Sequence, residues 1–290
     1  MRVLWEMLGG AGGLILPALY IILICTVVER FAPIERYPVA ARIPGILMNA
    51  AQLVFSAGLI WPLRMLWSSL GIGTLITVPL WQWLAPLGAG GYALQWLIGA
   101  MVADFCAYWR HRAEHLPWFW PIHAVHHAPT ELHAANDIGH PAQVWTNGLF
   151  VSIPLSMIQF DGPATPAVIL FVVTLLSYYI HSPIDVHFGP LRKVLVDNRF
   201  HRIHHSLEER HFDKNFAICF SIWDRLFGTA YDPAPDEWPS VGIAGVMPPR
   251  SLTDFLVLPL RVALGARTAD CTHAPRGEKC VTCAPSSPRS

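Results

Sequence analysis

Histidine is the residue type with the clearest chemical potential in this chain of 290 residues, and thirteen of the fourteen histidines lie between positions 111 and 211. Eight of them form three tight groups: HRAEH (His111, His115), HAVHH (His123, His126, His127) and HRIHH (His201, His204, His205). Histidine is the most common metal-ligating side chain. Residues three or four apart share one face of a helix, about one turn or ~5.4 Å along its axis. Each group therefore predicts one part of a metal site.

The number of clustered histidines indicates more than one metal. A four-coordinate zinc site uses at most four ligands, whereas two metals with four or five nitrogens each would use all eight. Neutral imidazole binds iron, zinc, copper and nickel. A lipid-facing or surface role, with histidines bonded to carbonyls and headgroups, explains single histidines but does not explain two copies of HxxHH.

Two other functions remain open from the residues alone. A dinuclear zinc hydrolase usually includes a bridging carboxylate, but Glu114 inside HRAEH is turned by about 100° per residue from its neighbours. A non-catalytic metal-binding or transport protein is the other alternative. Transporters place polar ligands near the midplane of their membrane spans, whereas these histidines lie outside the apolar stretches.

The elements that must position these histidines are strongly apolar. The chain is 53% hydrophobic and 14% charged, and its formal net charge of zero gives no electrostatic reason to bind nucleic acid. Six stretches approach the length of a membrane span: Leu8–Val28, Ile46–Leu63, Leu70–Leu87, Gly91–Trp109, Val144–Gln159 and Ala164–Ile180. We predict an all-α integral membrane protein with about four transmembrane helices, one or two re-entrant or interfacial segments, and a cytosolic histidine-rich helical cap.

Arginine placement predicts the orientation. Arg30, Arg36 and Arg42 fill the loop after the first apolar stretch, whereas Arg64 stands nearly alone beyond the second. The positive-inside rule then places this loop and the histidine region at the cytoplasmic face. We expect the first stretch to be a retained anchor rather than a signal peptide, because basic residues are few before it and no small-residue cleavage site follows. The Arg-rich, Ala- and Pro-rich composition indicates a bacterial gene, and we expect the protein to lie in the bacterial inner membrane.

The histidine groups belong to a longer ordered series of motifs. It runs D-x6-H-x3-H from Asp104, HAVHH, His-Pro at His140, HSPID at His181, RFHRIHHS, FDKNF and WDRLFGT, ending before Tyr231. This series resembles the membrane fatty acid hydroxylase/sterol desaturase superfamily of integral-membrane, histidine-rich di-iron oxygenases. The resemblance covers nearly half of the chain. One departure is Ile138, where the family often carries arginine.

The resemblance implies a fold and a reaction. The fold is a four-helix membrane anchor with a cytosolic helical cap. The reaction is O2 activation at a centre of two iron ions, with electrons from a separate reductase, to hydroxylate or desaturate a C–H bond of a membrane lipid. The substrates used on this scaffold include sterols, fatty acyl chains, carotenoids and ether lipids, so neither the lipid nor the choice between the two reactions is predicted.

The resemblance also implies the ligands, ten histidines with about five for each metal. These are His111, His115, His123, His126, His127, His140, His181, His201, His204 and His205. The other histidines of the region, His133, His187 and His211, are interpreted as structural residues or as hydrogen-bond partners. A ligating histidine usually donates its second N–H to a carboxylate or a carbonyl, and the candidates for such partners are Asp104, Asp185, Asn198 and Asp224, with Asp137 a further one.

The predicted organisation has four parts. Residues 1–103 form an N-terminal transmembrane region, and residues 104–231 form the catalytic region, which includes a transmembrane hairpin. Residues 232–264 are a C-terminal extension with a helical apolar pattern, and 265–290 are a disordered tail. The tail residues Cys271, His273, Cys280 and Cys283 supply the four ligands of a small zinc site, but a single CxxC without flanking structure favours a reduced, unstructured segment.

Overall fold

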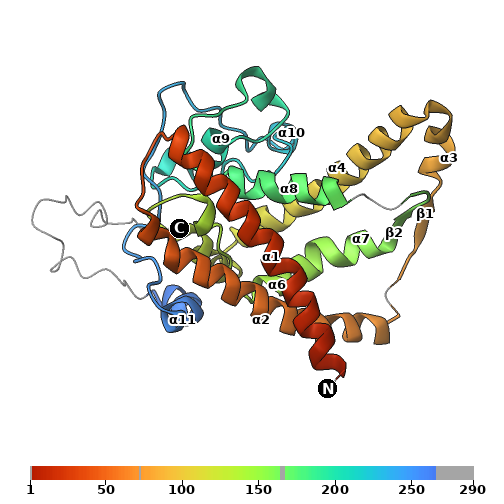
Figure 1. The fold of residues 1–290 in the computed structure, drawn as a ribbon, viewed down its shortest axis with the longest axis horizontal. Coiled ribbons are helices and arrows are strands. Elements are labelled where there is room, and N and C mark those ends of the chain that lie inside the picture. The colour runs from red at the N-terminus through yellow and green to blue at the C-terminus, as the bar shows by residue number, and fades with distance from the viewer. Residues whose placement is uncertain (1, 72, 164–166, 266–290) are drawn as a thin grey trace, which may run out of the picture.

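The computed structural model describes residues 2–71, 73–163 and 167–265 (Figure 1). The α-helices and strands are α1 (Arg2–Phe31), α2 (Arg42–Ser69), β1 (Ile76–Val78), α3 (Leu80–Leu84), α4 (Ala89–Glu114), α5 (Trp120–His127), α6 (Gln143–Asn147), α7 (Ile153–Met157), β2 (Ile158–Phe160), α8 (Ala167–Tyr179), α9 (Asn198–His204), α10 (Ile222–Leu226) and α11 (Leu252–Ala263). Short 3-10 turns are η1 (Val39–Ala41), η2 (Ala85–Leu87), η3 (Ala134–Asn136), η5 (Gly189–Lys193) and η6 (Glu209–His211), and η4 (Gly148–Ser152) is π-helical. The structure is therefore mostly helical, as predicted.

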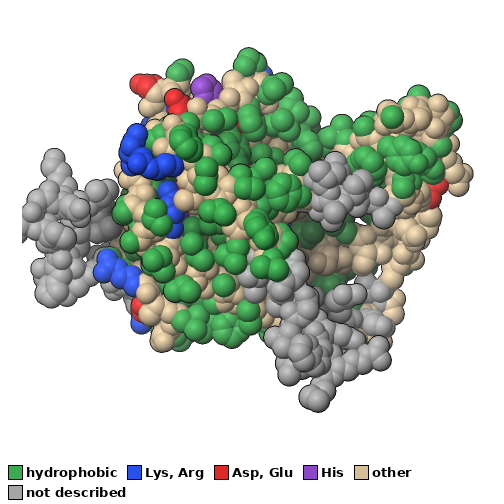
Figure 2. All heavy atoms as spheres, in the orientation of Figure 1, with side chains coloured by type: hydrophobic (Ala, Val, Ile, Leu, Met, Phe, Trp, Pro, Cys, Tyr) green, Lys and Arg blue, Asp and Glu red, His purple; other side chains and the backbone are tan. Residues whose placement is uncertain are grey.

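The long helices form an apolar scaffold for the histidine-bearing part of the structure, which comprises the end of α4, α5, α9 and the loops next to them and is called the cap below. α1 packs against both α2 and α8, and Ile21, Ala134 and Tyr178 lie in the core between them. The outer faces of these helices stay apolar, with Tyr20 63% and Leu47 64% exposed. Figure 2 shows this apolar surface over the middle of the molecule, while Lys and Arg side chains gather at the end where α1 meets α2. An apolar surface of this extent is typical of a protein that contacts lipid.

By length and hydropathy, one helix within the described parts of the chain is able to cross a membrane, with its most apolar window over residues 39–56. The predicted apolar stretch 70–87 is not a helix. It contains β1, α3 and η2. Pro79 lies between β1 and α3, and Pro86 lies inside η2, and proline lacks the N–H that a continuing helix needs.

The second departure from an all-α fold is a pair of short parallel strands. β1 pairs with β2 in the register Ile76↔Ile158 to Val78↔Phe160. β2 directly follows the continuous helical run of α6, η4 and α7, so the predicted stretch 144–159 ends as a strand. β-Branched residues in Ile-Thr-Val favour extended backbone, but the partner strand lies about 80 residues away and only the tertiary structure reveals it.

The cap is held to the scaffold by the C-terminal extension. Ser251 caps α11 by accepting a hydrogen bond from the Asp254 N–H at 3.1 Å. α11 then packs on α5, and Phe255 and Leu258 are buried against Val125. The amphipathic pattern predicted for this extension thus forms a helix that supports a histidine-bearing helix. The predicted tail site at Cys271, His273, Cys280 and Cys283 lies outside the described residues.

Gly45 marks the closest approach of α2 to the cap. A Cβ at this position would overlap the Ala135 carbonyl oxygen and the Asn136 side chain. The neighbouring Asn49 amide donates to the same Ala135 carbonyl at 2.9 Å, so α2 and η3 are tied together here. Gly45→Ala is expected to lower the free energy of unfolding by about 1–3 kcal/mol through this overlap.

Thermal unfolding of the detergent-solubilised protein measures this effect. Gly90→Ala is the matched control, because Gly90 also lies in a long helix and a Cβ there meets open space. Alanine is the better helix former, so the control is expected to be as stable as the parent or slightly more stable. Equal unfolding temperatures for both variants would contradict the close packing of α2 on η3.

Candidate metal centre

Nine histidines lie in two compact groups. The first group comprises His111 and His115 at the end of α4, His123 and His127 of α5, and His204 of α9. The second group comprises His126 of α5, His181 after α8, and His201 and His205 at the end of α9. Within each group the ligand atoms lie within 4.8 Å of one another. Each HxxHH motif thus contributes a pair spaced i, i+4 to one group and its remaining histidine to the other.

The Nε2 atoms of each group face one another. In the first group, His123 Nε2 lies 3.1 Å from the Nε2 atoms of both His111 and His127. In the second, His201 Nε2 lies 3.1 Å from those of His181 and His205. Two nitrogens that each lie about 2.1 Å from one metal ion are about 3.0 Å apart at 90° and about 3.4 Å apart at a tetrahedral angle. The observed spacings fit this range, so the donor sets suit two transition-metal ions.

The other ring nitrogens point outward to fixed acceptors. Backbone carbonyls lie at hydrogen-bonding distance from Nδ1 in four histidines, as follows: Phe216 O from His111 (2.7 Å), Ile138 O from His126 (3.1 Å), Ser177 O from His181 (2.9 Å) and Lys214 O from His204 (2.8 Å). A carbonyl only accepts, so the proton must lie on Nδ1 and the lone pair on Nε2. This tautomer is the one that a metal-ligating histidine needs.

Burial favours the neutral form of several of these histidines. It lowers the pKa of His123, His127 and His205 well below the ordinary histidine value, and the neighbouring imidazoles lower it further. Neutral imidazole is the form that binds metal. Within the described residues, no hydrogen-bond partner reaches the buried Nε2 of His115 or His204. Buried polar atoms normally have a partner, and a metal ion would supply one.

His140 does not join either group. Its Nδ1 accepts a hydrogen bond from the Ala142 N–H at 3.1 Å, and its ring packs at 5.7 Å from that of Phe255 in α11. The turn that follows at Pro141 directs this histidine toward α11 instead of toward α5 and α9. Its role as a ligand is thus implied by the resemblance alone.

The three histidines predicted to be non-ligands also lie outside both groups. His133 is buried beside the Tyr37 ring, and His187 is exposed near Asp185. His211 is buried, with Nδ1 2.8 Å from Ser206 Oγ and Nε2 3.1 Å from a carboxylate oxygen of Glu237. It therefore ties the segment after HRIHH to the C-terminal part of the cap.

Asp104 and Asp224 act on a loop and do not touch the ligands themselves. The Asp104 carboxylate accepts from the backbone N–H groups of Cys219 and Phe220 at 3.0 and 2.9 Å. Asp224 accepts from the N–H groups of Phe216 and Ala217 at 2.8 and 2.9 Å. The same loop supplies the Phe216 carbonyl that fixes His111. Asp224 thus orients His111 through one intervening peptide group, and Asp104 holds a later part of the same loop, whereas a direct contact with a ligand was expected.

Asn198 supports the segment that carries His181, whereas Asp185 lies away from both histidine groups. The Asn198 side chain donates to the carbonyls of Ser182 and Ile184 at 2.9 and 2.6 Å, which fixes the segment after His181 to the start of α9. Asp185 is exposed, and its contacts at 3.4 and 3.9 Å are with Arg199 and His187. The structure does not place Asp185 against either histidine group.

Glu114 is the residue that sequence reasoning missed. It is buried, and its Oε2 lies 3.2 Å from His123 Nδ1. Thr146 donates to its other oxygen, and Gln143 donates to Oε2 at 3.2 Å. The side chain does point away from the ligand face of its own helix, as expected, but it reaches a ligand on α5. The available signal was a carboxylate inside an apolar, histidine-rich segment, because buried charges require partners.

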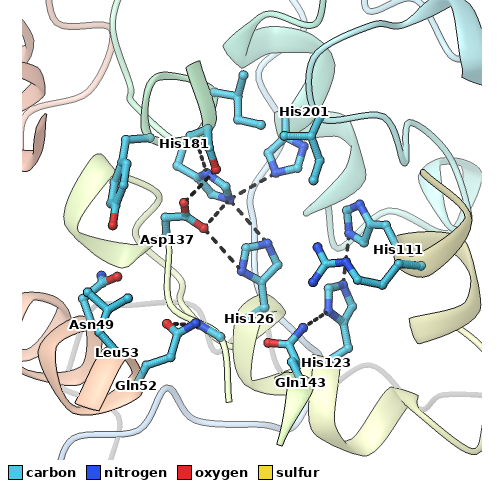
Figure 3. Close-up of a pocket in the computed structure, with 16 residues that line it drawn as sticks. Asn49, Gln52, Leu53, His111, His123, His126, Asp137, Gln143, His181 and His201 are labelled. Atoms are coloured by element: carbon cyan, nitrogen blue, oxygen red, sulfur yellow. Dashed lines mark hydrogen bonds and ion pairs between the residues drawn. The ribbon is translucent and has the colours of Figure 1, made fainter. Parts of the chain in front are cut away.

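A cavity of about 250 Å³ opens beside the two groups (Figure 3). His111, His123, His126, His181 and His201 line it together with residues of α2 and α6. Asp137 projects between two of these histidines, with Oδ1 3.9 Å from His126 Nδ1 and 3.7 Å from His181 Nε2. A molecule in this cavity would therefore lie directly against both candidate metal sites.

Comparison with known proteins connects this geometry to a family. Residues 96–229, which contain all nine grouped histidines, match the family model described as fatty acid hydroxylase. Human alkylglycerol monooxygenase is 32% identical over 136 residues, which is 46% of this chain and 30% of that protein. Ornithine lipid hydroxylase OlsE of Rhizobium tropici is 30% identical over 158 residues, 53% of this chain and 46% of the relative.

A third relative is named for a reaction other than hydroxylation. Very-long-chain aldehyde decarbonylase GL1-6 of Oryza sativa subsp. japonica is 25% identical over 159 residues, 51% of this chain and 24% of its own length. The chain thus covers less than half of the length of each of these relatives. No solved structure matches it.

Proposed function

We propose that this chain, whose residues 96–229 match the fatty acid hydroxylase family model, hydroxylates a C–H bond of a membrane lipid at a dinuclear iron centre. The observation that carries the proposal is the division of nine histidines, eight of them buried, into two groups whose Nε2 atoms face one another. The relatives named as a monooxygenase and as a lipid hydroxylase support hydroxylation over desaturation.

The first group would hold one iron ion and the second group the other. When bound, iron supplies O2 activation with electrons from a separate donor protein, so that one oxygen atom enters the C–H bond and the other leaves as water. The protein's own contribution is geometric. The carbonyls of Phe216, Ile138 and Lys214 hold three rings from behind, and burial excludes bulk water from the site.

Membrane attachment follows from the same proposal. We propose a multi-pass protein in which residues 1–103 and the hairpin from α6 to α8 lie in a bacterial inner membrane. The other, histidine-bearing parts of residues 104–231 would form the cap on the cytoplasmic face, with residues 232–264 as an extension of that cap. The exposed apolar faces of α1 and α2 support this placement, as do the basic side chains gathered at the cap end (Figure 2). Substrate would then reach the cavity from the bilayer.

Hydrolysis at a zinc pair is less well supported. Both histidine groups consist of imidazoles alone within the part of the chain that is described, and a bridging carboxylate is what such centres usually use. Glu114 binds the outer nitrogen of His123 and so stands behind a ligand, not between the two groups.

Labelled O2 distinguishes these reactions. Membranes that contain the iron-loaded protein and a reductase are expected to consume O2 and to incorporate the label into a lipid, detected by mass spectrometry. The reaction should stop when the reductase or O2 is withheld. Turnover of a lipid under anaerobic conditions without an electron donor would instead support hydrolysis and contradict the proposal.

A further inference from the structure

Arg110 places a cationic side chain in the wall of the cavity. It precedes His111 in α4 and lines the cavity with it. Its Nε is buried and has no hydrogen-bond partner among the residues that the structure describes. The guanidinium is therefore close to the metal-binding rings and has donors to spare.

The nearby carboxylates do not use those donors. Glu114 Oε1 lies 3.7 Å from Arg110 Nη1, which is longer than a hydrogen bond. Its oxygens already accept from Thr146 and Gln143 and lie against His123. Asp137, the acidic residue that lines the cavity, accepts from Ser177 at 3.1 Å. In the described parts of the chain it forms no ion pair with an arginine.

Gln52 offers a second donor from α2 (Figure 3). Its Oε1 accepts a hydrogen bond from the Gly139 N–H at 2.9 Å. This bond identifies the oxygen end of the amide, so the Nε2 end is a donor. No hydrogen bond joins this Nε2 to a described residue. The amide group is held beside the backbone, since a Cβ on Gly139 would lie 3.1 Å from that Nε2.

The cavity also has an apolar part, and bound metal ions would make it positively charged. Leu53, Ile180 and Ile218 supply apolar surface in the same cavity. An imidazole that binds a metal is neutral, so the two histidine groups would not cancel the charge of two bound metal cations. A purely hydrocarbon occupant would bury the guanidinium and the amide without an acceptor, which is unfavourable.

We propose that Arg110 and Gln52 form a subsite for an anionic oxygen group of the lipid, a carboxylate or a phosphate, so that the oxidised carbon lies near the polar end of the lipid. This inference rests on the proposed function and deepens it by naming the substrate class. An arginine fork donating to such an oxyanion is the strong form of hydrogen bond, and the apolar residues would hold the first carbons of the chain.

Isothermal titration calorimetry of the metal-loaded protein in a neutral detergent tests the subsite. The probes are octanoate, octyl phosphate, octanol and inorganic phosphate. Octanoate or octyl phosphate is expected to bind at least about tenfold more tightly than octanol. Arg110→Gln should remove that difference, Arg110→Lys should keep part of it, and Gln52→Leu should reduce it. Arg261→Gln, at an exposed ion pair with Asp254 on α11, is the control and should bind like the parent.

Three results would overturn the subsite. One is equal binding of octanol and the anionic amphiphiles. Another is octanoate binding that survives Arg110→Gln but disappears without metal, because the carboxylate would then only ligate the metal. The third is inorganic phosphate binding as tightly as octyl phosphate, which would indicate a site for free anions. Failure of the parent protein to bind two metals or to incorporate labelled oxygen would instead count against the proposed function, whatever the calorimetry shows.

Discussion

Replacing His201 with alanine is expected to abolish lipid hydroxylation and to remove the metal of the second group. His201 Nε2 lies 3.1 Å from the Nε2 atoms of both His181 and His205, so it is central to that donor set. Its loss leaves three imidazoles, and the reaction requires both metals. We expect the rate to fall on the order of a thousandfold or more. Metal analysis of the purified variant and label incorporation into lipid measure the two effects.

His187→Ala is the matched control for this substitution. His187 belongs to the same region of the chain and is half exposed, with Asp185 as its neighbour at 3.9 Å. It lies outside both histidine groups, so this variant should retain two metals and full activity. If His201→Ala also retained two metals and normal turnover, the second group would not be a metal site. If His187→Ala lost them, the assignment of the ligands would be wrong.

The spacing of the histidines predicted that each motif forms part of a metal site. It did not predict how the histidines of one motif divide between two groups. Residues three or four apart share one face of a helix only approximately, because the directions of i and i+4 differ by about 40° and those of i+3 and i+4 by about 100°. This difference explains why His123 and His127 turn to one group while His126 turns to the other. The repeated HxxHH pattern thus predicts two groups once the angles are considered. Which α5 histidine meets which α9 histidine depends on helix packing.

Contacts between distant segments account for most of what the sequence did not predict. Asp104 was expected to bind a ligand on its own helix, but it accepts from backbone N–H groups more than a hundred residues away. Those N–H groups belong to an irregular loop, which has no periodic pattern to predict its course. His140 turns to α11, whose position against α5 also follows only from the tertiary structure.

Apolar composition was a reliable guide to helices but not to every segment. The stretches that became α1, α2, α4 and α8 are long and have at most one internal proline. The stretch 70–87 has the same apolar character, but Pro79 and Pro86 divide it. Hydropathy measures burial or lipid contact and not backbone conformation. The prolines were therefore the better local signal there.

Glu114→Gln is expected to weaken metal binding at the first histidine group by about 10–100-fold while leaving the second group loaded. The carboxylate lies 3.2 Å from His123 Nδ1, so its negative charge raises the electron density that His123 Nε2 offers to a metal. Glutamine keeps the size of the side chain but removes the charge. Competition with a chelator, followed by metal analysis, should show one site released at a lower chelator concentration than in the parent.

Glu209→Gln is the control, because Glu209 is an exposed carboxylate in η6 that lies outside both histidine groups. It removes the same charge from the cap and should leave both affinities unchanged. Glu114→Ala should be worse than Glu114→Gln, because it also leaves the donors of Thr146 and Gln143 without their acceptor. Release of both metals together in Glu114→Gln would mean that the two groups act as one site. Unchanged binding in both Glu114 variants would mean that the carboxylate only accepts hydrogen bonds from Thr146 and Gln143 and does not tune a ligand.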